Sequence, residues 1–168
     1  MAISLHDATI KAFTRSLTNL SAFLKKGESH LDENSTPHSK LLEARLVPDM
    51  YPLTYQIQRI SDIAKGAAVR LAGMEPVSMP DNEATFEDLQ ARITKTLELL
   101  KTVSEDSMAG KEGKEVVIKT MKGEVKFTGK SYVLDYAVPN FYFHVNMAYA
   151  ILRMQGVPVG KGDYLGPL

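Results

Sequence analysis

The fold is decided by the stretch Pro139-Asn-Phe-Tyr-Phe-His-Val-Asn-Met-Ala-Tyr-Ala-Ile-Leu-Arg-Met-Gln-Gly156, which predicts a long final helix. Pro139 fits the first turn of a helix, where the missing N–H of proline leaves no hydrogen bond unmade. Gly156 fits a left-handed C-cap, and Pro158 follows just beyond it. His144, two asparagines and several aromatic rings lie between these ends. The final helix is therefore the place to look for a functional site.

Three other segments place apolar residues at three- and four-residue steps, which is typical of helices with one buried face. The first is expected over about 7–26, with Gly27 as its C-cap. The second begins around Pro48–Pro52 and ends at Gly73, and the third covers about 85–103.

Shorter elements are expected between and after these helices. Thr85 and Asp88 form a capping box at the start of the third helix, and Pro37 opens a short helical turn. From Glu115 to Thr128 the apolar period changes to alternation around Met121-Lys122-Gly123, which predicts a β-hairpin packed against the helices. The tail, 157–168, is rich in glycine and proline and is expected to be irregular.

These elements predict an all-α fold, an up-down four-helix bundle with a small β-hairpin between the third and fourth helices. A chain of 168 residues is expected to form a single domain, 1–168, that is large enough for a core. No internal repeat is seen.

The composition excludes several classes of protein. Twenty basic and 20 acidic residues give a net charge of zero, so a nucleic-acid partner is not favoured. The absence of cysteine excludes disulfides and thiolate chemistry. No apolar run approaches the ~20 residues of a membrane span. The first residues lack the pattern of a signal peptide, so we expect a cytoplasmic protein.

His144 and Asn140 are the first candidates for a site. A neutral imidazole suits a metal ligand or a general base, but His144 can equally be a core or boundary residue with satisfied nitrogens. Asn140 precedes His144 by four residues, so both lie on one helix face. The pair suits hydrogen bonding to a ligand better than metal binding, and Asn140 can also be a helix cap.

Asp49, Tyr55 and Gln56 are the candidates on the second helix. Asp49 is interpreted either as a site carboxylate or as an N-terminal carboxylate stabilised by the helix dipole. Tyr55 or Gln56 is expected to face the bundle centre. The other histidines, His6, His30 and His38, lie in polar or terminal surroundings and are expected to be solvated.

Longer motifs carry a resemblance to a known superfamily. They are Ala44–Met50, Ala64–Ala68, Arg70–Gly73, Phe127–Gly129, Pro139–Val157 and Gly160–Leu165. Together they resemble the DinB-like (YfiT-like) metalloenzyme superfamily and, within it, a bacterial and fungal family of unknown function. The resemblance spans nearly the whole chain and implies the same four-helix bundle.

The resemblance also implies where a metal would lie. Superfamily members hold a divalent metal with three histidines, one from the second helix and two from an His-x3-His pair on the last. The second of that pair corresponds to His144, the first to Asn140, and the second-helix position falls near Tyr55 or Gln56. Two of the three ligands are therefore missing, and we expect a degenerate metal site with poor affinity for zinc or nickel.

The leading hypothesis is a protein of unknown function that binds an unidentified small molecule between the second and last helices. Its site residues would be Asp49, Tyr55, Gln56, Asn140 and His144. No cofactor is expected, although His144 could ligate zinc, nickel or manganese. The alternatives are a metal-dependent or His144-based enzyme (a hydrolase or thiol-linked transferase, as the resemblance suggests) and a non-catalytic interaction protein. A homodimer is plausible for this superfamily.

Overall fold

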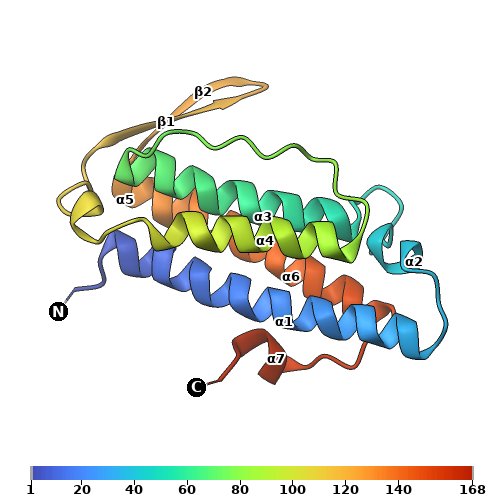
Figure 1. The fold of residues 1–168 in the computed structure, drawn as a ribbon. Helices are drawn as coiled ribbons and strands as arrows, with labels where there is room; N and C mark the ends of the chain where they lie inside the picture. Colours follow the sequence, from blue (N-terminus) through green and yellow to red (C-terminus); the bar gives the residue numbers. More distant parts are fainter. Residues whose placement is uncertain (1, 168) are drawn as a thin grey trace.

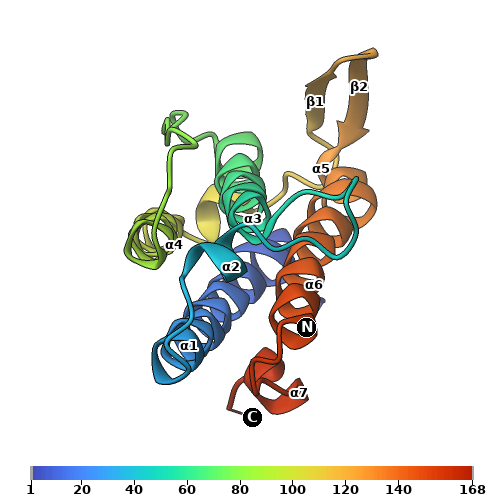
Figure 2. The same cartoon turned by 90° about the vertical axis from the view of Figure 1, so that its right-hand side faces the viewer.

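The computed structural model describes residues 2–167 and shows four long helices packed side by side (Figure 1). They are α1 (Ala12–Glu33), α3 (Leu53–Ala67), α4 (Phe86–Lys101) and α6 (Val138–Met154). Viewed along the bundle, α3 lies between α4 and α6, and α1 packs against both of them from the opposite side (Figure 2). The predicted fold, a helical bundle with one hairpin, is confirmed.

The core is formed by the apolar stripes that the sequence predicts. Phe13 of α1 and Phe141 of α6 are fully buried, and their rings stack with centroids 4.0 Å apart. Leu17, Leu20 and Ile57 are also fully buried. Burying one such side chain contributes about 1.5–3 kcal/mol, so these stripes hold the helices together.

The first helix is longer than predicted. A π-helical turn (Asp7–Lys11) leads into α1, which continues to Glu33 instead of ending near Lys26. Gly27 is buried within this helix, where an added Cβ would lie 2.6 Å from Cδ2 of Leu152. The prediction of a C-cap at Gly27 is therefore wrong, because this glycine allows close packing against α6.

The second and third helices follow the sequence closely. After the short helix α2 (Ser39–Leu42), α3 begins directly after Pro52, continues as a π-helical turn (Ala68–Ala72) and ends at Gly73. Gly73 has a φ of 79°, the left-handed conformation expected of a C-cap. The capping box at Thr85 and Asp88 is confirmed, with both reciprocal hydrogen bonds present.

The last helix begins ten residues before the predicted start. Thr128 caps α5 (Gly129–Ser131), a π-helical segment (Tyr132–Ala137) follows, and α6 continues from it without a break. Pro139 lies in the first turn of α6, as predicted, but the helical run that contains α6 already begins at Gly129. A proline inside a helix lacks an N–H and crowds the preceding turn, and the wider π-helical turns directly before Pro139 accommodate it.

The hairpin is confirmed, as β1 (Glu115–Thr120) paired antiparallel with β2 (Gly123–Thr128). It extends beyond the end of the bundle, and Met121 at its tip is fully exposed (Figures 1 and 2). Near its base, Phe127 packs against Tyr132 and Tyr136 of the last helical run. The predicted packing against the helices thus holds for the base and not for the tip.

The tail contains a short helix, α7 (Lys161–Leu165), where irregular structure was predicted. The carboxylate of Asp163 accepts a hydrogen bond from the backbone N–H of Gly160 and so caps this helix. Asn19 and Arg15 of α1 donate to the carbonyls of Tyr164 and Leu165, which fixes α7 against α1. None of the described helices is long and apolar enough to cross a bilayer.

Candidate functional site

His144 of α6 meets Gln56 of α3 across the helix interface. Nδ1 of His144 lies 2.7 Å from Oε1 of Gln56, and Nε2 of Gln56 donates to the carbonyl of Tyr51 at 2.9 Å. A backbone carbonyl can only accept, so the Gln56 amide must turn its nitrogen to Tyr51 and its oxygen to His144. Nδ1 of His144 therefore carries the proton and donates it to Gln56.

The second ring nitrogen of His144 is left open. Nε2 has no hydrogen-bond partner among residues 2–167, and it is not one of the buried polar atoms. Burial, together with a smaller effect of the charge of Arg59, lowers the pKa of His144 to about 4. At neutral pH the side chain is thus an uncharged imidazole whose Nε2 lone pair faces outward as a hydrogen-bond acceptor.

Aromatic side chains lie beside the His144 ring. Tyr55 lies edge-on to His144 with ring centroids 6.3 Å apart, and Tyr51 stacks on Tyr55 at 4.0 Å. The guanidinium of Arg59 lies 5.1 Å from the Tyr55 ring centroid, in the geometry of a cation–π contact. Tyr51 and Phe143 are 58% and 50% exposed, so the cluster opens to the surface.

The structure brings together only some of the predicted site residues. Asn140 is half-buried one turn before His144 and makes no hydrogen bond within the described part of the chain. Asp49 is exposed in the turn from Val47 to Met50, ahead of α3, and is not at the helix N-terminus as expected. The polar contacts of the cluster therefore involve His144, Gln56 and Tyr51, with Tyr55 as an aromatic neighbour.

The donor set does not fit a tightly held divalent metal. Within residues 2–167, no group of three or more His, Cys, Asp or Glu side chains is placed to hold an ion. Zinc sites use at least three imidazole, thiolate or carboxylate ligands, whereas this cluster offers one imidazole beside a neutral amide and phenols. We therefore derive no chemistry through a metal at His144.

Two residues of the His144 cluster, Arg59 and Tyr51, were not predicted from the sequence. Arg59 follows Tyr55 by four residues, a spacing that places both on one helix face and that could have revealed the pair. Tyr51 acts through its backbone carbonyl, for which no sequence signal exists. His6 was expected to be solvated but is 8% exposed, with Nε2 3.1 Å from the carbonyl of Val103.

The fold defines the class of protein, a DinB-like helical bundle, in which His144 of α6 contacts Gln56 of α3. Residues 5–165 match the family described as "Domain of unknown function (DUF1993)", and the chain belongs to this family. A crystal structure of a DinB family member from Shewanella denitrificans is similar, with 35% sequence identity and a TM-score of 0.92. The match covers 98% of this chain and 93% of that one. No curated protein matches the chain.

The depressed pKa of His144 makes a prediction for stability. A pKa of about 4 in the folded chain, against an ordinary 6.5, means that the unfolded chain takes up the proton first as the pH falls. The stabilisation is complete above pH 6.5 and is lost between pH 6.5 and 4, by on the order of 2 kcal/mol after allowance for partial exposure. Urea unfolding at pH 7 and at pH 4 measures the fall in the free energy of unfolding between the two pH values. This fall should be smaller in His144→Gln than in the wild type by this amount.

The control for this measurement is His30→Gln, at a half-buried histidine of α1 that lies outside the cluster and forms no ion pair with a carboxylate in the described chain. We expect this variant to lose as much stability as the wild type over the same pH range. An equal pH dependence in His144→Gln and the wild type would contradict the assignment of a low pKa to His144.

Proposed function

We propose that the protein binds a small molecule at the cluster of His144, Gln56 and Tyr55, with the open Nε2 of His144 as the recognising atom. The observation that carries this proposal is the fixed tautomer. Nδ1 of His144 donates its proton to Oε1 of Gln56, and this hydrogen bond fixes the orientation of the ring. The lone pair on Nε2 therefore has a fixed direction before any ligand binds. A preformed acceptor beside aromatic rings is the kind of arrangement that small-molecule sites use.

The chemistry of the cluster selects the ligand class. An uncharged imidazole cannot form an ion pair with a carboxylate, and the guanidinium of Arg59 is already paired with Asp62 and Asp81, so the cluster favours a neutral ligand. Nε2 requires an O–H or N–H donor, and the Tyr51–Tyr55 stack suits a flat apolar body. We therefore propose a neutral ligand that carries a hydroxyl or amide N–H on an aromatic or apolar body, such as a phenol.

Binding is favoured over catalysis by the low pKa of His144. A general base works best when its pKa lies near the operating pH, and a pKa of about 4 makes a weak base at neutral pH. The enzyme alternative with His144 as base is therefore the weaker proposal. A homodimer stays a prediction, which light scattering of the purified protein would test.

The test compares phenol with anisole, which has nearly the same shape but no O–H. Titration of protein labelled with 15N at histidine should move the Nε2 resonance of His144 with phenol and leave it nearly unchanged with anisole. Because one neutral hydrogen bond contributes about 0.5–1.5 kcal/mol, phenol should bind about three- to tenfold more tightly than anisole.

The matched variants are His144→Ala, which removes the acceptor, and His38→Ala, at a half-buried histidine outside the cluster. His144→Ala should abolish the difference between the two compounds, and His38→Ala should preserve it. If phenol and anisole bind equally to the wild type, or if the resonance that moves belongs to another histidine, the proposal is wrong.

A further inference from the structure

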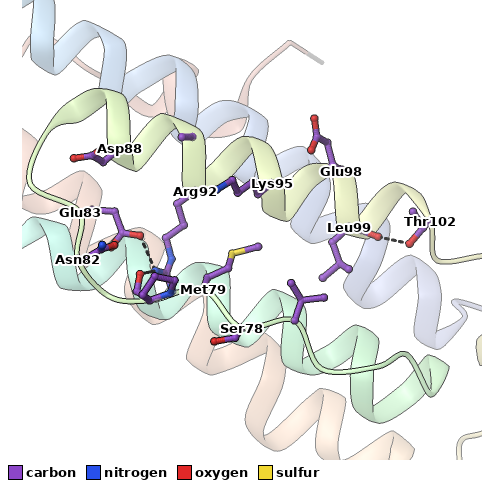
Figure 3. Close-up of a pocket in the computed structure, with 13 residues that line it drawn as sticks. Ser78, Met79, Asn82, Glu83, Asp88, Arg92, Lys95, Glu98, Leu99 and Thr102 are labelled. Carbon is purple, nitrogen blue, oxygen red and sulfur yellow. Dashed lines mark hydrogen bonds and ion pairs between the residues drawn. The ribbon is translucent and has the colours of Figure 1, made fainter.

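A second candidate site lies away from His144, in a groove between α4 and the linker that joins α3 to α4 (Figure 3). Its volume is about 530 Å³, which is within the range of small-molecule sites. It lies on the α4 side of α3, whereas His144 is on the α6 side (Figure 2). The groove is lined by residues 77–80 and 82–83 of the linker, and by residues 88, 91, 92, 95, 98, 99 and 102 of α4 and its end.

The middle of the groove is apolar. Leu99 of α4 and Met79 of the linker direct their side chains into the space between the two segments (Figure 3). Val77 and Ala91 add to the lining, and Val77 is 43% exposed although it is a large apolar residue. An open lining of this kind favours an apolar body as the occupant, since burying it removes apolar surface from water.

The hydrogen-bonding capacity left in the groove consists mainly of donors. Lys95 has no carboxylate within ion-pair distance in the described chain, and it lies one turn after Arg92 on α4. Arg92 also lines the groove, and its side chain is 2% exposed. The Nε–H group of Arg92 is buried and has no hydrogen-bond partner in the described chain. An unsatisfied buried donor is costly, so an incoming acceptor beside Arg92 would be stabilised.

Two of the three lining carboxylates, Glu83 and Asp88, are engaged in hydrogen bonds within the protein. The two oxygens of Glu83 accept from Arg92 and Gln58, and Asp88 accepts the backbone N–H groups of Ala84 and Thr85 in the capping box. The side chain of Glu98 points away from the linker (Figure 3). Among the described lining residues, the cation without an ion-pair partner is therefore the ammonium of Lys95.

From this arrangement we propose that the groove binds a small amphipathic carboxylate. Its apolar body would lie between Met79 and Leu99, and its carboxylate would pair with Lys95 beside the unpartnered Nε–H of Arg92. The same chemistry is offered by a free carboxylic acid and by the C-terminus of a peptide that ends in an apolar residue. The site is separate from the proposed site at His144, and the two proposals stand or fall independently.

The experiment titrates 15N-labelled protein with hexanoate and, as the matched neutral compound, hexan-1-ol. The amide resonances of residues 77–83 and 91–102 should shift on titration. The shifts should saturate and should fit the binding of one ligand molecule per protein. N-acetylleucine serves as the mimic of a peptide C-terminus, and the more tightly bound of the two acids identifies the source. Because only the acid can form a charged hydrogen bond with Lys95, and exposure to solvent weakens that bond, hexanoate should bind about three- to tenfold more tightly than the alcohol.

The variants are Lys95→Gln and Lys95→Glu, with Lys101→Gln as the control at an exposed lysine of the same helix outside the groove. Lys95→Gln should weaken hexanoate about three- to tenfold, Lys95→Glu should abolish detectable binding, and Lys101→Gln should leave it unchanged. Shifts confined to other regions, equal binding of hexan-1-ol, or equal effects at Lys95 and Lys101 would overturn the proposal. Absence of saturable binding up to millimolar concentrations of either acid would overturn it as well.

Discussion

Replacing Arg92 with leucine should lower the free energy of unfolding by about 3–5 kcal/mol, because the change leaves the carboxylate of Glu83, whose side chain is 8% exposed, without its cation. The guanidinium lies 2.7 Å from Glu83, 2.9 Å from Asp62 and 2.9 Å from Asp81. Asp62 is on α3, and Asp81 and Glu83 are in the linker. The side chain of Arg92 therefore connects α4 to both α3 and the linker. Leucine keeps most of the volume and removes every one of these contacts.

The loss should also depend on pH. Burial raises the pKa of Glu83, but hydrogen bonds from Arg92 and Gln58 outweigh burial and hold the pKa below its ordinary value. Without Arg92 the pKa of Glu83 rises, so the variant is destabilised most at neutral pH, where Glu83 is charged. The difference between the wild type and Arg92→Leu should therefore shrink as the pH falls through the range in which Glu83 takes up a proton.

Urea unfolding at pH 7 and at pH 4 measures both effects. The control is Arg153→Leu, at an exposed arginine of α6 that forms no ion pair in the described chain, and it should change stability by less than about 0.5 kcal/mol. The double variant Arg92→Leu with Glu83→Gln should be more stable than the sum of the two single losses predicts. A cost below about 1 kcal/mol for Arg92→Leu would show that the network contributes little.

Gly129→Ala should cost about 3 kcal/mol, because there is no space for a methyl group at this position. Gly129 is buried at the start of α5, and an added Cβ would lie 2.1 Å from the carbonyl oxygen of Lys111. The obstacle is backbone and cannot rotate away as a side chain can, so the loop before β1 or the start of the last helical run must move. The backbone N–H of Lys130 donates to the carbonyl of Glu112 at 2.9 Å, and this hydrogen bond would be strained as well.

Gly113→Ala is the matched control, since Gly113 lies in the same loop and an added Cβ there meets nothing within 4 Å. Thermal unfolding followed by circular dichroism should show a large fall in Tm for Gly129→Ala and almost none for Gly113→Ala. Similar Tm values for the two variants would mean that the loop yields at little cost and that the close approach is not important for stability.

Most of the fold could be predicted because its signals are local. The capping box at Thr85 and Asp88, the left-handed end at Gly73 and the alternation of the hairpin are each encoded within a few residues. The predicted helix limits failed where a glycine or proline lies inside a helical run. Gly27 looks like a helix end but is an internal contact with Leu152, and Pro139 lies in the first turn of α6 but inside a helical run that begins earlier.

The candidate site was predictable as a location and as a residue type, since His144 and Gln56 were both identified on the chain. The hydrogen bond between them was not predictable, because the two residues are 88 positions apart in the sequence and meet only when α3 packs against α6. Asp49 illustrates the same limit. Its place near the second helix suggested a site carboxylate, yet the chain turns there and leaves it exposed, outside the polar contacts of His144.

The sequence by itself determined the four amphipathic helices, the hairpin and the presence of a single histidine at the centre of the last helix. Only the tertiary structure decided which nitrogen of that histidine carries the proton, since the choice depends on the Gln56 amide and the Tyr51 carbonyl. Only the tertiary structure gathered Arg92 with three carboxylates from two other segments. The physical reason is that helix periodicity is set by neighbours within one or two turns. The protonation and pairing of a buried polar group are set by whichever atoms the packing brings within hydrogen-bond distance.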